Sequence, residues 1–385
     1  MAATKMSEHV ALSEESVHNE TYEVKQKTNF EDVPVEEKLD LLLEAEKLMR
    51  SDKANVLATF LSLSEDVATE YLITTEGTRV QTTLPKPSFY YFVTVKEGNK
   101  SAQRYWHYGG CGGFEVIKSW KIPELLHGEI RAITNNLKKS VKPPKKPIDI
   151  VCGPQVVGIM CHESVGHPHE ADRIFGREAA QAGESFITRE SIGTKIGTDI
   201  VTVVDDPLVE KSFGHYKYDN EGVKARRKFL IKNGKTNEFL HNRETAAAMG
   251  IKSNGSSRAT QYNRESIVRM SNTFLLPGGY TEDELIREVK HGVYMKNFNE
   301  WNIDDKRLNQ KYVGAECYLI ENGELTKEVY QPTLEINTPD LWSSVRGIAK
   351  NTEYHAGTCG KAQPLQAIPV WFGGPSLLLR NIRLS

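Results

Sequence analysis

The first third of the chain alternates between a helical pattern and a strand pattern. Residues 33–50 place leucines on one side of a segment that begins near Pro34 and ends in basic residues, which predicts an amphipathic helix. Residues 55–106 change to short strand-like runs, and this pattern predicts an antiparallel meander. The breaks between the runs fall at Glu76-Gly77, Pro85-Lys86-Pro87 and Gly98-Asn99.

A second helical stretch covers residues 122–139 and leads into residues 142–147, which are rich in proline and lysine. Prolines lack the N–H that a helix needs, and lysines favour solvent. This segment therefore predicts a domain boundary.

The remainder of the chain is richer in strands. Residues 148–152 predict a buried strand, and Gly153-Pro154 begins an apolar helix. Further strands are predicted over residues 201–206, 228–240 and 317–329, and the last two ranges each contain an Asn-Gly turn typical of a tight hairpin. Residues 251–265 predict a long loop, and residues 283–291 predict a short helix.

Composition and charge exclude several classes of protein. The 385 residues suggest about two domains. Lys and Arg number 49 against 51 Asp and Glu, for a net charge of −2, and this balance argues against nucleic acid as a partner. The mean hydropathy is −0.48, and no apolar run approaches the roughly 18 residues of a membrane span, so we expect no membrane partner. The polar N-terminus lacks the apolar core of a secretory signal, which predicts a flexible lead-in and a cytoplasmic protein.

The candidate chemistry lies in the apolar helix after residue 153, where His162, Glu163 and His167 occur within six positions. In the commoner zinc-peptidase pattern the two histidines are four residues apart and face one metal, with the glutamate acting on water. Here they are five apart, which leaves their rings about 140° apart on a regular helix. Gly166 is permissive and Pro168 disfavours the helical conformation before it, so we expect the helix to break or bulge and bring both histidines to one ion.

A catalytic zinc site needs a third protein ligand. Cys359, in a glycine-flanked turn, is the best distant candidate because a thiolate suits zinc. Closer in sequence, Cys161 would point about 100° away from its neighbour and is better explained as a buried apolar side chain. Glu170 is a candidate ligand, a residue that orients a histidine, or an acidic loop residue. His169 and Asp172 are further alternatives, and the sequence alone leaves the choice open.

The motif from His162 to Asp172 resembles the HExxxH signature of the TldD/PmbA family of metallopeptidases, on its metal-bearing TldD side. Other segments agree with that family in the same order, and the resemblance runs from about Phe30 to the end of the chain. They are YGGCGG (108–113), VTVVDD (201–206), VRMSNTFLLPGG (268–279), YLIENGELTK (318–327) and GTCGKAQPLQAIPVWFGGPSLLL (357–379).

This resemblance implies an α+β fold, in which a shortened N-terminal α/β domain with an antiparallel sheet is followed by a β-rich C-terminal domain that carries a metal-binding helix. Together with the polar N-terminus and the proline-rich boundary, the expected domains are a flexible segment over residues 1–29, a partial α/β domain over residues 30–146 and a metallopeptidase domain over residues 147–385. Relatives in the family cleave short or unfolded peptides, including precursor leader peptides, inside a cavity closed by two subunits. A homodimer or a heterodimer with a PmbA-type subunit is therefore expected.

The resemblance also assigns roles at the site. It implies that zinc is held by His162, His167 and Cys359, with Glu163 as the general base. Glu170 and Asp172 become candidates for supporting the ligands. The family's arginine and asparagine correspond to Arg269 and Asn272, which are expected either to support the site or substrate, or to make ordinary hydrogen bonds at a strand end.

The sequence departs from the family pattern in two ways. Full-length relatives carry roughly another hundred residues before the matched region, and Pro168-His169 replace a small and an apolar residue. The missing residues suggest one rival function, a non-catalytic, partner-dependent subunit. A separate rival is a metal hydrolase of small amides. A thiol peptidase that pairs Cys359 with His162 is less favoured, because Glu163 and the second histidine indicate a metal.

Overall fold

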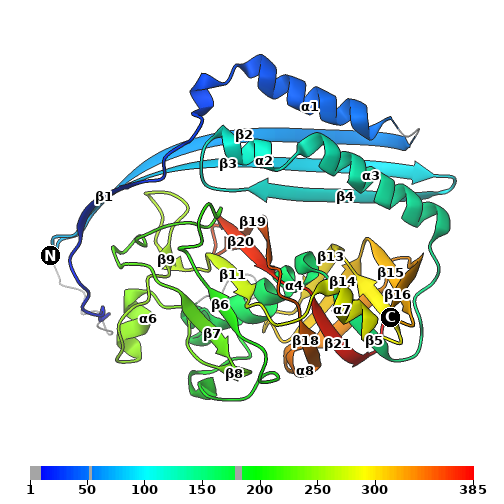
Figure 1. Ribbon diagram of the computed structural model, residues 1–385. Helices are drawn as coiled ribbons and strands as arrows, with labels where there is room; N and C mark the ends of the chain where they lie inside the picture. The colour runs from blue at the N-terminus through cyan, green and yellow to red at the C-terminus, as the bar shows by residue number, and fades with distance from the viewer. Residues whose placement is uncertain (1–9, 52–53, 178–183) are drawn as a thin grey trace.

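The structure of the protein is a computed structural model that describes residues 10–51, 54–177 and 184–385. The N-terminal third of the chain forms a four-stranded sheet with helices on one face, and it spans the top of the molecule in Figure 1. The strands are β1 (Asn19–Glu23), β2 (Asn55–Ile73), β3 (Arg79–Glu97) and β4 (Lys100–Gly109). The helices are α1 (Val35–Met49), α2 (Phe114–Ser119) and α3 (Ile122–Lys139), and a 3-10 turn covers Phe30–Asp32. Both expected helices and the β2–β3–β4 meander are present.

The proline pair at Pro85 and Pro87 does not break the meander as predicted, because β3 runs through it. On one side, β3 pairs with β2 along its whole length. On the other side, β1 ends its pairing at Thr83 and β4 begins at Ser88. The carbonyls of both prolines face this gap, where the backbone N–H groups of Gly110 and Gly112 donate to them. Their missing N–H groups therefore disrupt no ladder hydrogen bond.

The N-terminal segment also differs from the expected flexible lead-in. It contains β1, which lies parallel to β3 with Asn19 opposite Arg79. Before β1, the backbone N–H of Ser13 donates to the carbonyl of Arg243 at 2.9 Å. Residues 1–9 lie outside the described residues. The segment thus joins the N-terminal sheet to the C-terminal half.

The C-terminal half is built on two six-stranded sheets. The first has the order β19-β20-β11-β6-β7-β8, and the second has the order β16-β15-β12-β5-β21-β18. A three-stranded sheet has the order β13-β14-β17, and β9 pairs with β10. The strands are β5 (Ile148–Cys152), β6 (Val203–Asp205), β7 (Lys228–Lys232), β8 (Lys235–Thr236), β9 (Ser257–Arg258), β10 (Ile267–Val268), β11 (Asn272–Leu275), β12 (His291–Met295), β13 (Phe298–Ile303), β14 (Asn309–Gly314), β15 (Cys317–Glu321), β16 (Glu324–Glu328), β17 (Thr333–Asn337), β18 (Val345–Ile348), β19 (Glu353–Lys361), β20 (Gln366–Gly374) and β21 (Leu377–Ile382).

Short helices connect these strands. They are α4 (Pro154–Cys161), α5 (Ala171–Ile174), α6 (Arg243–Ala248), α7 (Glu282–Arg287) and α8 (Thr338–Ser343), and a 3-10 turn covers Arg189–Ser191. The two predicted Asn-Gly turns are present, with positive φ at Asn233 and Asn322 and at the glycine after each. Among the described residues, no helix is both long and apolar enough to cross a membrane.

The apolar helix α4 lies in the centre of the molecule, against β11, β19 and β20 (Figure 1). Its residues Val156, Val157 and Met160 are fully buried. They belong to one apolar core that also includes residues of the N-terminal sheet, such as Tyr91. This packing fixes the C-terminal end of α4, where the candidate ligands begin, in the interior.

Candidate metal centre

The two histidines come together because α4 changes to a π-helical turn. The turn covers His162–Gly166, and the backbone N–H of His167 donates to the carbonyl of His162, five residues earlier. A five-residue spacing therefore completes one turn, and the two rings lie 4.9 Å apart between centroids. The break that the sequence predicted takes the form of this π turn, followed by a 3-10 turn over His167–His169.

Gly166 has a different role from the one expected. Its φ is −57°, within the ordinary helical region, so the turn does not need its conformational freedom. A Cβ at this position would instead lie 1.8 Å from the sulfur of Met270. Gly166 is therefore required by close packing against the Met270 side chain.

Cys359 completes the cluster from strand β19. Its Sγ lies 3.4 Å from Nε2 of His167, and the candidate ligand atoms of His162, His167 and Cys359 all lie within 4.8 Å of one another. All three side chains are buried. Burial acts to raise the pKa of the Cys359 thiol, but the charges of His167 and His162 outweigh it and hold that pKa well below its ordinary value.

These three residues fit a zinc ion. Two imidazoles and a thiolate are ligands that zinc accepts, and three protein ligands leave a fourth position open. Nδ1 of His162 is buried and has no hydrogen-bond partner among the described residues. Nδ1 of His167 contacts Glu170 at 3.0 Å, which leaves Nε2 directed at the cluster.

Glu170 orients His167 and is itself held by two cations. Its Oε2 lies 2.7 Å from Nε of Arg173 and 3.3 Å from Nζ of Lys361. Burial acts to raise the pKa of Glu170, but the charges of Lys361, His167 and Arg173 outweigh it and keep that pKa well below its ordinary value. Lys361 also donates to both oxygens of Asp172, at 2.7 and 2.8 Å. A carboxylate that fixes the ring of a ligand histidine is a usual feature of metal sites.

Glu163 is held by two residues from the β13–β14 hairpin. Nε1 of Trp301 donates to its Oε1 at 3.1 Å, and Nη1 of Arg307 donates to its Oε2 at 3.1 Å. Both oxygens of the carboxylate therefore have a donor. Trp301 and Arg307 were not predicted from the sequence, because neither lies in a motif and both are more than a hundred residues from Glu163 along the chain.

Arg269 and Asn272 are both fully buried, and neither lines the cavity around the cluster. Arg269 donates to the carbonyl of Cys359 at 2.5 Å and to the carbonyl of Gln366 at 2.9 Å. It thus supports the strand that carries Cys359. Asn272 instead donates to the Asp206 carbonyl at 2.7 Å, which is the strand-end hydrogen bonding considered for it.

The alternative third ligands that are close to the motif in sequence do not belong to the cluster of His162, His167 and Cys359. Nδ1 of His169 contacts the carbonyl of Val165 at 2.7 Å, and burial lowers its pKa to about 4. Cys161 is buried, and burial raises the pKa of its thiol above the ordinary range. Neither belongs to the group of candidate ligands found among the described residues.

The cluster opens into a cavity of about 560 Å³ between the N-terminal sheet and the C-terminal half. A cavity of this size is in the range of peptide and small-molecule sites. Its lining combines the candidate ligands and Glu163 with aromatic side chains and five consecutive residues of β19. The lining residues are Tyr90, Tyr105, Trp106, His107, Ile159, His162, Glu163, His167, Phe298, Trp301, Arg307, Ala356, Gly357, Thr358, Cys359, Gly360, Val370 and Phe372.

Comparison with known proteins agrees with the resemblance seen in the sequence. Residues 28–129 match the PmbA/TldA metallopeptidase central domain, and residues 145–385 match the PmbA/TldA metallopeptidase C-terminal domain. A metalloprotease of Methanocaldococcus jannaschii is 32% identical over 355 residues, which cover 92% of this chain and 75% of that relative. A zinc metalloprotease TldD homolog of Saccharolobus solfataricus is 27% identical over 271 residues, which cover 70% of this chain and 58% of that relative.

A solved structure has the same fold. The crystal structure of TldE from Thermococcus kodakarensis superposes with a TM-score of 0.76 at 16% identity, and the match covers 98% of this chain and 80% of that one. The family match extends over both halves of the chain, and the C-terminal match contains all three candidate ligands. The chain belongs to the PmbA/TldD family of metallopeptidases.

Proposed function

We propose that this protein is a zinc-dependent peptidase that hydrolyses short or unfolded peptides, such as precursor leader peptides. The observation that carries the proposal is the convergence of His162, His167 and Cys359 beside Glu163 in one cavity. A relative named zinc metalloprotease supports the choice of metal. Zinc bound by these ligands would supply a Lewis acid that polarises the peptide carbonyl and makes a water molecule more acidic.

The general base in this proposal is Glu163. Its carboxylate accepts the proton of the attacking water and then donates it to the departing amine, so the same oxygen serves both halves of the reaction. Trp301 and Arg307 hold the two carboxylate oxygens in one orientation. Proton transfer depends on such positioning, because the base must lie within hydrogen-bond reach of the proton.

An extended peptide fits the strand that carries Cys359. β19 is the outermost strand of its sheet. Thr358 lies opposite Pro369, which has no N–H to donate, so this position is a non-hydrogen-bonded pair. The backbone groups of Ala356, Thr358 and Gly360 therefore point away from β20, and all three residues line the cavity. A peptide can add to such an edge as a further strand, and only an unfolded segment has its backbone free to do so.

The test compares the wild type with Glu163→Gln on a library of quenched fluorescent peptides, with zinc measured by elemental analysis. We expect Glu163→Gln to lose roughly a hundred- to ten-thousandfold in cleavage rate and to keep its zinc. Glu353→Gln serves as the matched control, because Glu353 lies at the start of β19 outside the cavity lining and should leave the rate unchanged. Undiminished cleavage by Glu163→Gln would contradict the assigned base, and cleavage of acylated amines in preference to peptides would favour the small-amide hydrolase.

We also propose that the protein acts as one subunit of a homodimer or of a heterodimer with a PmbA-type relative. Its fold is that of TldE, and α1 presents Val35, Leu39 and Leu43, four residues apart, at 53 to 63% exposure. Apolar residues at this spacing form one stripe on a helix, and such a stripe is typical of a subunit contact. Light scattering of the purified chain, alone and with the partner, tests this association. A monomer under all conditions that still cleaves peptides would contradict it.

A further inference from the structure

Four aromatic side chains share one face of the N-terminal sheet. Phe60 on β2 lies opposite Phe92 on β3, and Phe92 lies opposite Tyr105 on β4, so all three project from the same side. Tyr90 projects from that side two residues before Phe92. Its ring lies 6.2 Å from the ring of Phe60 and 6.5 Å from the ring of Tyr105. We call these four residues the aromatic strip.

The aromatic strip lies on the face of the sheet that the helices do not cover. On the opposite face, Phe89 and Tyr91 are completely buried in the core. Phe60 is 57% exposed and Tyr105 is 43% exposed, although both belong to long, regularly paired strands. A row of exposed aromatic rings is typical of a binding surface.

The aromatic strip is continuous with the candidate metal centre. Tyr90 and Tyr105 line the same cavity as His162 and Glu163. Phe60 continues the strip outward to β2, two strand spacings from β4, a distance of roughly 10 Å. An extended peptide covers that distance with about three residues. A chain that leaves the cavity in this direction therefore crosses all three strands.

We propose that the aromatic strip is a substrate subsite whose outer end, at Phe60, binds an aromatic or large aliphatic side chain of the peptide, about three residues from the peptide residue that passes Tyr105. Beside the strip on the same face lie Ser62, Thr94 and Gln103, which are uncharged, and His107, whose pKa is lowered by burial so that its neutral form is favoured. They offer no charge that would select an acidic or basic side chain. The subsite rests on the proposed peptidase function, and it adds a preference that acts away from the scissile bond.

The test measures binding and cleavage separately. A series of labelled peptides of Ser, Gly and Ala carries one Phe at successive positions, with the all-Ser-Gly-Ala peptide as reference. Dissociation constants come from fluorescence anisotropy with the zinc-loaded Glu163→Gln protein, and kcat/KM comes from the wild type. Both are repeated with Phe60→Ala. The matched control is Tyr71→Ala, because Tyr71 is 72% exposed on the same strand but projects from the other face.

We expect one position of Phe to tighten binding about three- to tenfold over the reference peptide, and Phe60→Ala to abolish that gain while Tyr71→Ala keeps it. No gain at any position, or a gain that Phe60→Ala leaves intact, would overturn the subsite. A change of oligomeric state in Phe60→Ala with unchanged peptide binding would assign the strip to a subunit contact and also overturn it. If Phe tightens binding through Phe60 but the wild type cleaves no peptide, the peptidase function fails while the subsite stands.

Discussion

Substituting Lys361 with methionine would remove the cation that joins two buried carboxylates behind the candidate metal centre. Nζ of Lys361 lies 2.7 Å from Asp172, 3.3 Å from Glu170 and 2.7 Å from the carbonyl of Val268. After the substitution, Glu170 keeps its contact with Arg173, but the carboxylate of Asp172 loses its paired cation. Removing one partner of a buried ion pair typically costs about 3–5 kcal/mol of unfolding free energy.

The same substitution should weaken zinc binding. Glu170 contacts Nδ1 of His167, and Lys361 is one of the cations that hold Glu170 in place. Losing a residue that supports a ligand in this way typically costs about ten- to a hundredfold in metal affinity. We therefore expect Lys361→Met to lower the urea midpoint and to raise the dissociation constant for zinc, measured by competition with a chromogenic chelator.

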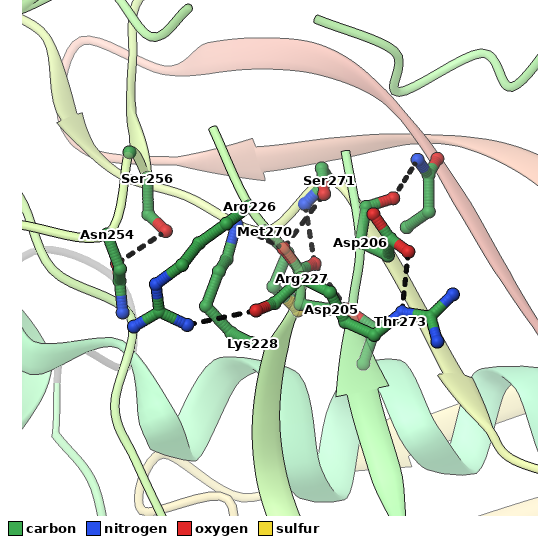
Figure 2. A network of polar contacts seen from close by, with 12 residues as sticks. Asp205, Asp206, Arg226, Arg227, Lys228, Asn254, Ser256, Met270, Ser271 and Thr273 are labelled. Atoms are coloured by element: carbon green, nitrogen blue, oxygen red, sulfur yellow. Dashed lines mark hydrogen bonds and ion pairs between the residues drawn. The ribbon is translucent and has the colours of Figure 1, made fainter. Parts of the chain in front are cut away.

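The control is a second buried lysine. Nζ of Lys228 lies 3.1 Å from Oδ1 of Asp205, and both side chains are fully buried. Figure 2 shows this pair within a network in which Ser271 and Thr273 also donate to Asp205. Lys228→Met should lose a similar unfolding free energy while the contact between His167 and Glu170 stays intact. Equal zinc affinity in Lys361→Met and the wild type would refute the reasoning, because stability would then have changed without any effect on the ligand.

Three further predictions concern the turn, the base and the thiolate. Gly166→Ala should lose about 1–3 kcal/mol in urea denaturation through its clash with Met270, and adding Met270→Ala should recover part of that loss. Arg307→Met should lower kcat roughly 10- to 100-fold at unchanged zinc content, because Glu163 loses one of its two donors; an unchanged kcat would contradict this. Cys359→Ser should remove most of the bound zinc in elemental analysis, and full zinc content would exclude the thiolate as a ligand.

Elements whose formation depends on residues close together in the chain were predicted correctly from the sequence. The leucine pattern of α1 and the Asn-Gly turns are local signals, and the structure contains these elements where they were expected. The break predicted at the proline pair in β3 was wrong, because the effect of a proline on a strand depends on which side of the strand is paired. That information lies in the ends of β1 and β4, which no local pattern shows.

The candidate site likewise contains residues that a local motif predicts and residues that only the fold brings together. His162, Glu163 and His167 stand in one motif, and their spacing already required a distorted helix. Lys361 donates to Asp172, which is 189 residues away along the chain. Trp301 and Arg307 donate to Glu163, which is 138 residues from Trp301 and 144 residues from Arg307. Such contacts are created by packing of whole sheets, and a single sequence carries no record of which distant residues meet.

The sulfur of Cys359 and the imidazole of His167 meet across 192 residues of chain. A metal ion that coordinates both would act as a reversible cross-link, closing a loop of that length between the 3-10 turn at His167–His169 and strand β19. Closing a loop restricts the unfolded chain, and the entropic effect grows with the logarithm of loop length. Metal that binds only the folded chain also stabilises it in proportion to the logarithm of its free concentration. If the site binds zinc as proposed, the metal load would therefore change the stability of the whole C-terminal half, and a chelator should lower its melting temperature.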